Sequence, residues 1–144
     1  MSSSSVAVLV QVAATFVWLG MVVAISLLEA PLKFRAPGIT LALGLGIGRL
    51  VFRALNWAEA ALAALATIAL IIEPRGVAPV TLLTGLWAIL LVQMLAIRPR
   101  LDARAQRIID GAPPPPARVH LAYIGLEGVK VIALAVLGTV LVLG

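Results

Sequence analysis

The 144-residue sequence has no cysteine and few charged side chains, and both shortages restrict what the protein can be. Without cysteine, disulfides, thiolate metal sites and cysteine nucleophiles are excluded. Charged residues make up 12% of the chain, whereas a typical soluble domain has about 25%. Hydrophobic residues reach 62% and the mean hydropathy is +1.15, so a soluble fold would expose large apolar patches. The composition therefore predicts an integral membrane protein.

Side chains for metal and cofactor chemistry are also scarce. The single histidine, His120, excludes a bis-His haem or a two-His metal site within one chain. Met21 and Met94 alone make a poor copper path, since such paths stack several soft ligands. No phosphate-binding loop and no Ser-His-Asp arrangement is recognisable. We therefore expect no metal and no cofactor, assign no catalytic residue, and favour a protein without enzyme activity over an enzyme.

Four apolar runs have about the length, ~20 residues, that a helix needs to cross the hydrocarbon of a bilayer. They cover residues 6–28, 50–72, 80–97 and 120–142. Pro31 follows the first run and predicts the end of that helix. Apolar character also continues upstream of the second run, which predicts an interfacial or extended helical piece there. The expected fold is all-α: one domain, residues 1–144, forming an integral membrane four-helix bundle.

Basic residues are concentrated in two of the three loops. Lys33 and Arg35 lie in the first loop, five arginines belong to the third, and Arg75 is the one basic residue of the middle loop. Because cytoplasmic loops carry an excess of Lys and Arg, we expect segments 29–38 and 98–119 in the cytoplasm. Both termini would then lie outside the cell (inner) membrane. The net charge of +5 thus reports orientation, and no nucleic-acid partner is expected.

The last apolar run carries its strongly polar side chains on one face. On a helix, His120, Tyr123, Glu127 and Lys130 fall within an arc of roughly 80°, at about 100° per residue. An unpaired charge near the bilayer centre costs about 3 kcal/mol or more. This face is therefore expected to turn toward other helices or toward water.

Other spans supply charges to match. Arg49, Arg53, Asn56 and Glu59 share a face of the second helix, and Glu29 ends the first span. If the second and fourth spans are parallel, these residues lie at the depths of the polar groups on the fourth. We therefore predict a buried polar cluster between helices one, two and four, with Glu59–Lys130 or Glu127–Arg53 as its ion pairs. The candidate ion- or substrate-binding residues are Glu29, Arg49, Arg53, Asn56, Glu59, His120, Tyr123, Glu127 and Lys130.

Such a cluster has two interpretations. Paired charges can simply hold helices in register, and buried pairs contribute little net stability. Alternatively, ionisable groups inside a membrane line a pathway or a binding site. The number of charged groups favours the second interpretation. Tyr123 is expected as an interface anchor or hydrogen-bond donor, and Trp18, Trp57 and Trp87 as packing residues rather than a cofactor cage.

Single features allow two interpretations each. Gly44 and Gly48 form a GxxxG spacing that favours close helix packing, although Gly46 between them would also suit a flexible segment. His120 could relay protons near neutral pH or be an interfacial residue. The four prolines of 113–116 predict an extended spacer more than a docking ligand.

Several short motifs resemble the transmembrane protein 205-like family. They are Trp-Leu-Gly in the first span, LLEAPLKFRAPG at its end, GRLVF in the second span, QMLAIRPRLDARAQRI at the end of the third, and the histidine that opens the last. RPRLDAR is the most specific of them. The similarity covers nearly the whole chain, and Glu127 with Lys130 departs from the family pattern. The resemblance implies a small four-span bundle, and it implies no activity, because this is a domain-of-unknown-function family.

Three functions follow as hypotheses. The first is a small transport or permeation protein that binds an ion or proton at the cluster and works as a homo-oligomer. The second is an accessory or interaction subunit of a larger membrane complex. The third is a membrane-embedded enzyme acting on a lipid or quinone, with Glu127 or His120 as base. In each case the partners include membrane lipids, with anionic lipid at the basic cytoplasmic loop.

Overall fold

The computed structural model describes residues 3–144, and this part of the chain is helical with no strand. Its helices combine into four rods that are long and apolar enough to cross a membrane. The rods are Ser3–Arg35, Leu41–Ile72, Val77–Ile109 and Arg118–Leu143. The predicted all-α membrane four-helix bundle is confirmed, and the protein is a multi-pass membrane protein.

Two of the rods are built from several helical segments. The first rod consists of α1 (Ser3–Val22), the π-helix η1 (Val23–Glu29), α2 (Ala30–Leu32) and the 3₁₀ helix η2 (Lys33–Arg35). The third rod consists of α4 (Val77–Val92), the π-helix η3 (Gln93–Ile97) and α5 (Arg98–Ile109). The second and fourth rods are single helices, α3 (Leu41–Ile72) and α6 (Arg118–Leu143). The extended piece predicted before the second span is thus the first part of α3, continuous with the span.

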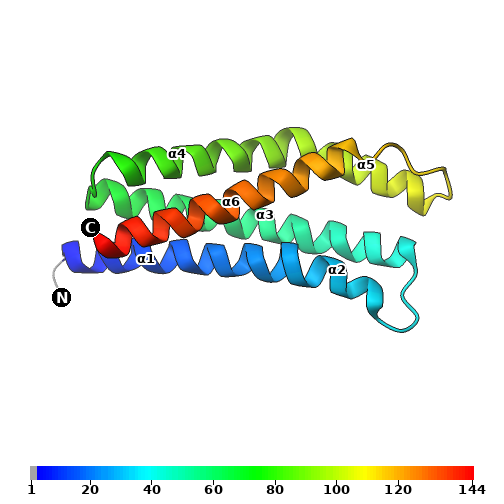
Figure 1. The fold of residues 1–144 in the computed structure, drawn as a ribbon, viewed down its shortest axis with the longest axis horizontal. Helices are drawn as coiled ribbons and strands as arrows, with labels where there is room; N and C mark the ends of the chain where they lie inside the picture. The colour runs from blue at the N-terminus through cyan, green and yellow to red at the C-terminus, as the bar shows by residue number, and fades with distance from the viewer. Residues whose placement is uncertain (1–2) are drawn as a thin grey trace.

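The rods alternate in direction, so the start of α1 and the end of α6 lie at the same end of the bundle (Figure 1). Helices α3 and α6 run in the same direction, as expected from four spans (Figure 1). Helices α1 and α4 each pack against both α3 and α6, and α3 makes few direct contacts with α6. Helices α3 and α6 therefore face each other across the diagonal of the bundle.

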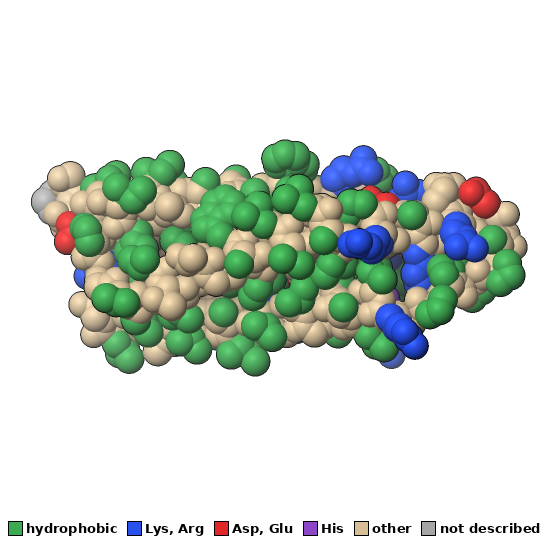
Figure 2. Space-filling model, turned by 90° about the horizontal axis from the view of Figure 1, so that it is seen from above, with side chains coloured by type: hydrophobic (Ala, Val, Ile, Leu, Met, Phe, Trp, Pro, Cys, Tyr) green, Lys and Arg blue, Asp and Glu red, His purple; other side chains and the backbone are tan. Residues whose placement is uncertain are grey.

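The outer surface is apolar along most of its length, with charge collected at one end. Figure 2 shows Lys and Arg side chains gathered around the end that carries the first and third loops. Large apolar side chains such as Ile71 and Leu95 are about three-quarters exposed on the rods, at 73% and 74%. Such a belt is stable against acyl chains and would be costly against water.

The core combines small and large side chains. Ala63 and Ala66 of α3 are buried and leave room for α1 to pack closely, which is how helices gain contact in a bilayer. Trp18, Leu86 and Leu134 come from three different rods and fill the centre with no exposed surface. This apolar core occupies the half of the bundle near the termini, and the polar site lies beyond it.

Polar groups close the helix ends. Thr40 caps α3, its hydroxyl accepting a hydrogen bond from the Leu43 amide at 3.1 Å. At the other end of α3 the Gln11 amide donates to the carbonyls of Ala69 and Glu73, at 2.9 and 2.8 Å. The turn that follows needs Gly76, whose φ of +84° is a left-handed conformation that favours glycine.

Pro31 does not end the first helix, contrary to the prediction. A proline ring clashes with the carbonyl four residues before it, and the π-helical turns of η1 end two residues ahead of Pro31, at Glu29. The π-helix η3 ends two residues ahead of Pro99 in the same way. In both rods the widened turns let the helix continue through the proline. The predicted loop 98–119 is accordingly helical as far as Ile109, with the proline run beyond it.

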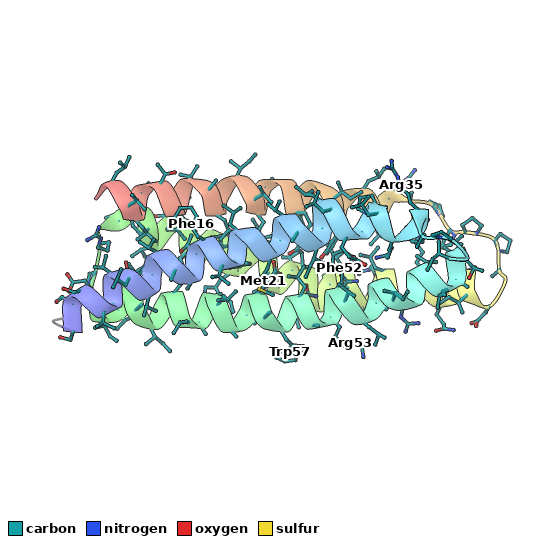
Figure 3. All side chains as sticks on the ribbon, turned by 90° about the horizontal axis from the view of Figure 1, so that it is seen from below. Phe16, Met21, Arg35, Phe52, Arg53 and Trp57 are labelled. Atoms are coloured by element: carbon teal, nitrogen blue, oxygen red, sulfur yellow. The ribbon has the colours of Figure 1, made fainter. Side chains whose placement is uncertain are left out.

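The glycine spacing on α3 serves close packing within the chain. A side chain on Gly44 would collide with the Phe34 ring, and one on Gly48 would lie 3.0 Å from Lys33 Nζ. Both partners belong to η2, so the two glycines let the end of the first rod lie against α3. Of the three tryptophans predicted as packing residues, Trp57 points outward and is 67% exposed (Figure 3).

Candidate functional site

A buried ion cluster joins the two diagonal helices near the middle of the bundle. Lys130 Nζ on α6 lies 2.7 and 3.0 Å from the two carboxylate oxygens of Glu59 on α3. The same ammonium lies 2.7 Å from Glu127 Oε1, one turn earlier on α6. None of the three residues is more than 2% exposed. The predicted pair Glu59–Lys130 is therefore confirmed.

Each carboxylate has neutral donors in addition to the shared ammonium. The Trp18 indole N–H donates to Glu59 Oε1 at 3.1 Å. The Gln93 amide donates to Glu127 Oε1 at 2.7 Å, and the Ser26 hydroxyl donates to Glu127 Oε2 at 2.5 Å. All four rods thus contribute, where the sequence had predicted three. Buried charges are tolerated when hydrogen bonds surround them in this way.

The two π-helices supply both neutral donors of Glu127. Ser26 lies in η1 and Gln93 opens η3, and each of these segments precedes a proline. A π-turn has more residues per turn than an α-helix, so it rotates later side chains around the axis relative to α-helical spacing. The two π-helices therefore lie at the depth of Glu127, and each contains one of its neutral hydrogen-bond donors.

The cluster contains one more negative charge than positive charge. Glu59 and Glu127 can both be ionised, and Lys130 is the one cation in contact with either carboxylate within residues 3–144. A net charge in a low-dielectric interior costs several kcal/mol of free energy, so such a charge is usually neutralised by a proton or a counter-ion. One bound proton or one monovalent cation would neutralise the cluster.

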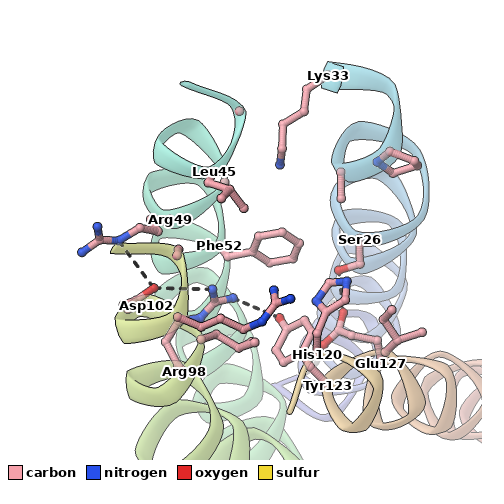
Figure 4. A pocket seen from close by; sticks show the side chains of 18 of the residues that line it. Ser26, Lys33, Leu45, Arg49, Phe52, Arg98, Asp102, His120, Tyr123 and Glu127 are labelled. Atoms are coloured by element: carbon pink, nitrogen blue, oxygen red, sulfur yellow. Dashed lines mark hydrogen bonds and ion pairs between the residues drawn. The ribbon is translucent and has the colours of Figure 1, made fainter. Parts of the chain in front are cut away.

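A cavity of about 550 Å³ opens above the cluster, at the basic end of the bundle. Glu127 and Ser26 form part of its wall, so one carboxylate of the cluster borders this space. Figure 4 shows Lys33 and Phe52 pointing into the space between the helices, with Tyr123 and Glu127 beyond them. The cavity therefore connects the basic end with the buried charges.

Two cations share one aromatic ring in this cavity. Lys33 Nζ lies 5.6 Å from the centre of the Phe52 ring, and the Arg98 guanidinium carbon lies 4.9 Å from it. Arg98 also lies 5.2 Å from the Tyr123 ring and donates to the Tyr123 hydroxyl at 3.4 Å. Distances below about 6 Å are in the range of cation–π attraction. The rings hold both cations in place without neutralising them.

Asp102 on α5 is the shared ion-pair partner of three arginines. Its oxygens lie 3.8 Å from Arg49, 3.9 Å from Arg53 and 3.9 Å from Arg98. These long contacts join α3 to α5 at the wall of the cavity. Because three guanidinium groups share one carboxylate, this wall keeps an excess of positive charge.

The predicted pair Glu127–Arg53 does not form, and this prediction is wrong. The Arg53 side chain is 60% exposed and points away from the bundle (Figure 3). Its partner is Asp102 on α5 of the third rod. At this position α5 lies closer to α3 than α6 does. An exposed pair of this kind contributes about 0–1 kcal/mol.

The remaining predicted residues fall around the cluster or the cavity. Asn56 is buried on α3, one turn before Glu59. Glu29 lies 3.4 Å from Lys33 and is outside the cluster. Arg49, His120 and Tyr123 line the cavity. The structure therefore brings Glu59, Glu127 and Lys130 together and distributes the other predicted residues nearer the basic end.

Several important residues were missed by the sequence interpretation. Ser26 and Gln93 are neutral side chains in apolar runs, and Gln93 lies off the helical stripe that regular α-helical spacing predicts. Arg98 and Asp102 were placed in a loop. One signal was available for Gln93 and Ser26: each is a hydrogen-bonding residue shortly before a proline in a span.

Comparison with known proteins gives no match for this chain: no family model, curated protein or solved structure is significantly similar to it. The resemblance to the transmembrane protein 205-like family therefore stays a prediction. The site is interpreted below from its own chemistry.

Proposed function

We propose that the protein is a small membrane transport or permeation protein in which the cluster of Glu59, Glu127 and Lys130 binds and releases a proton. The observation that carries this proposal is that two buried carboxylates share one ammonium beside a cavity. Intramembrane carboxylates in such positions serve as proton relays in pumps and transporters.

Of the two carboxylates, Glu127 can take a proton with the smaller change to its hydrogen bonds. Both oxygens of Glu59 accept hydrogen bonds from the Lys130 ammonium, and Oε1 also accepts one from Trp18. Neither of these donors can accept a hydrogen bond, so a proton on either oxygen of Glu59 would compete with an N–H donor. Glu127 Oε2 has a different partner, the Ser26 hydroxyl, which can accept as well as donate. A proton on this oxygen would reverse one hydrogen bond and disturb no N–H donor.

Buried polar side chains on α1 support a route for protons from the cluster to the end of the bundle that carries the termini. Gln11, Thr15 and Trp18 are buried on one face of α1, at spacings of four and three residues. A void of about 10 Å³ lies beside Gln11 and Thr15, which is about the space that one water molecule needs. The Gln11 side-chain oxygen is buried there without a hydrogen-bond partner in the part of the chain that the structure describes.

We further propose that the basic end faces the cytoplasm and that the protein lies in the inner membrane. Lys and Arg side chains gather at this end, and such a bias is typical of cytoplasmic loops. The cavity would then admit protons from the cytoplasm, and the buried polar side chains of α1 would lead to the outer face.

Proton flux into phosphatidylcholine liposomes tests the proposal. The purified protein is reconstituted with an internal pH-sensitive dye, and a valinomycin-set potassium potential drives protons inward. We expect wild-type flux well above that of empty liposomes. Glu127→Gln should lower it at least about tenfold, the low end for removing a proton-transfer group. Asp110→Asn is the matched control, because within residues 3–144 this carboxylate accepts one side-chain hydrogen bond, from Gln106, and it lies outside the spans.

Two results would contradict the proposal. Wild-type flux equal to that of empty liposomes would exclude proton permeation under a driving force. Equal flux in Glu127→Gln and wild type would exclude Glu127 as the proton site. Circular dichroism and gel filtration of each variant show whether a loss of flux comes from unfolding.

A further inference from the structure

We propose that the cavity at the basic end binds one molecule of an anionic phospholipid, with its phosphate at Arg98, Lys33 adding positive charge on the other side of the Phe52 ring, and its acyl chains leaving toward the bilayer. This is a second function of the same end of the bundle, and it does not require that the cluster conduct protons.

The charges around the cavity favour an anion. Its lining includes four cationic side chains, Lys33, Arg49, Arg98 and Arg104, against the two carboxylates of Asp102 and Glu127. Glu127 is already bound to Lys130. Glu29, outside the lining, offsets part of the Lys33 charge at 3.4 Å. The balance in the cavity is therefore positive.

Arg98 keeps donor capacity for a ligand. Its contact with Asp102 is 3.9 Å long and its bond to Tyr123 is 3.4 Å long, both weak. Its Nε is buried and has no hydrogen-bond partner among residues 3–144. Such a donor is costly to leave unpaired, and a guanidinium binds phosphate oxygens with two parallel hydrogen bonds. A phosphate at this position would satisfy it.

Lys33 lies across the same aromatic ring from Arg98. Both cations contact Phe52, and Lys33 is also 5.6 Å from the Phe34 ring. The Lys33 side chain is only 10% exposed, although it is on a loop-end 3₁₀ helix. Lys33 therefore points inward where an ordinary loop lysine would extend into water. The two inward cations therefore lie on two sides of the Phe52 ring, and both add positive charge to the same cavity (Figure 4).

The apolar part of the wall favours a lipid over a soluble anion. Leu27 of η1 and Ile124 of α6 both line the cavity, and they are 50% and 51% exposed. Both lie on apolar rods, so the surface that they expose faces acyl chains. The cavity thus reaches the lipid-facing side between these two residues. Its volume of about 550 Å³ is suited to a headgroup and its glycerol.

Lipid retention measured by native mass spectrometry tests the inference. The protein is purified in a mild detergent, stripped of lipid, and mixed with phosphatidylglycerol or with phosphatidylcholine. We expect one tightly retained phosphatidylglycerol and no tightly retained phosphatidylcholine. Lys33→Gln with Arg98→Gln should weaken phosphatidylglycerol binding by about tenfold or more, because a charge-assisted contact and a second nearby cation are lost. The control is Arg100→Gln, which removes an exposed arginine of the same helix that is outside the cavity wall.

A second variant that changes no charge tests the site even if the double variant misfolds. Ile124→Trp places a large ring at the lipid-facing mouth, on an exposed site that needs no repacking. We expect it to reduce phosphatidylglycerol retention while leaving the melting temperature unchanged. Full retention in both the double variant and Ile124→Trp would overturn the inference.

Inorganic phosphate separates the two sources of the anion. If millimolar phosphate displaced phosphatidylglycerol completely, the site would be one for a soluble anion and the lipid assignment would be wrong. Retention in the presence of phosphate supports it. The measurement involves no gradient, and the flux assay uses neutral liposomes without phosphatidylglycerol. If the proton-flux proposal fails, the lipid-binding result can therefore still be interpreted, and the reverse also holds.

Discussion

Glu59 and Lys130 meet across the diagonal of the bundle, with Nζ 2.7 Å from Oε1 and no exposed surface on either residue. They are 71 residues apart in the chain and belong to helices that make few other contacts. Long side chains are needed to span this diagonal. The ion pair therefore fixes the relative position of two helices that neighbouring side chains do not hold directly.

Lys130→Met should destabilise the fold. The substitution leaves the carboxylates of Glu59 and Glu127 buried without their shared cation, and breaking a buried pair in this way costs about 3–5 kcal/mol. The loss can be measured as a shift of the unfolding midpoint on titrating sodium dodecyl sulfate into dodecylmaltoside micelles. Arg53→Met removes a cation that is mostly exposed, and it should change stability by less than about 1 kcal/mol.

A double variant separates charge from packing. Adding Glu59→Gln to Lys130→Met removes one of the two unpaired carboxylates, so it should recover part of the lost stability. If Lys130→Met alone unfolded at the wild-type midpoint, the ion cluster would not be holding the helices together.

Trp18→Phe should cost more stability than Trp87→Phe. Both indoles donate one hydrogen bond, at 3.1 and 3.0 Å, but Trp18 donates to the buried carboxylate of Glu59 and Trp87 to the hydroxyl of Thr67. Hydrogen bonds to charged groups contribute about 1.5–3 kcal/mol, and neutral ones about 0.5–1.5 kcal/mol. Each variant also loses the same indole volume. Trp18 is fully buried and Trp87 only partly buried, so the cavity left behind adds to the cost at Trp18. Equal losses would contradict a strong hydrogen bond from Trp18 to a charged Glu59.

The sequence predicted those parts of the fold that depend on periodicity. Apolar runs of membrane length gave the four rods, and the parallel second and fourth spans brought Glu59 to the depth of Lys130. The pairing then followed, because an unpaired charge at that depth is too costly to leave facing lipid. These inferences use only helix rise, charge and the thickness of a bilayer.

The errors share one physical cause, the assumption of regular α-helical turns that stop at proline. The first and third rods continue through Pro31 and Pro99, and their π-helices contain Ser26 and Gln93, which donate to Glu127. With the third rod extended to Ile109, Asp102 moves from a supposed loop onto a helix beside α3 and takes Arg53 as its partner. A π-turn depends on packing around the helix as well as on the proline, so local sequence does not specify it.

Cysteine labelling should show which end of the bundle faces the cytoplasm. The native chain has no cysteine, so a single introduced thiol is labelled without background. Val77→Cys lies near the turn between α3 and α4 and is 80% exposed, and Ala117→Cys lies at the start of α6 at the opposite end. Because Lys and Arg gather at the Ala117 end, we expect this site to be cytoplasmic.

In intact cells a membrane-impermeant maleimide should therefore label Val77→Cys, and it should reach Ala117→Cys only after the membrane is permeabilised. Denaturing each sample before labelling is the control for thiols that are buried rather than on the far side. The reverse pattern would place the cavity of Lys33 and Arg98 outside the cell. Glu127 would then take its proton from the exterior, and the anionic lipid would have to come from the outer leaflet, which would change both proposals in direction but not in chemistry.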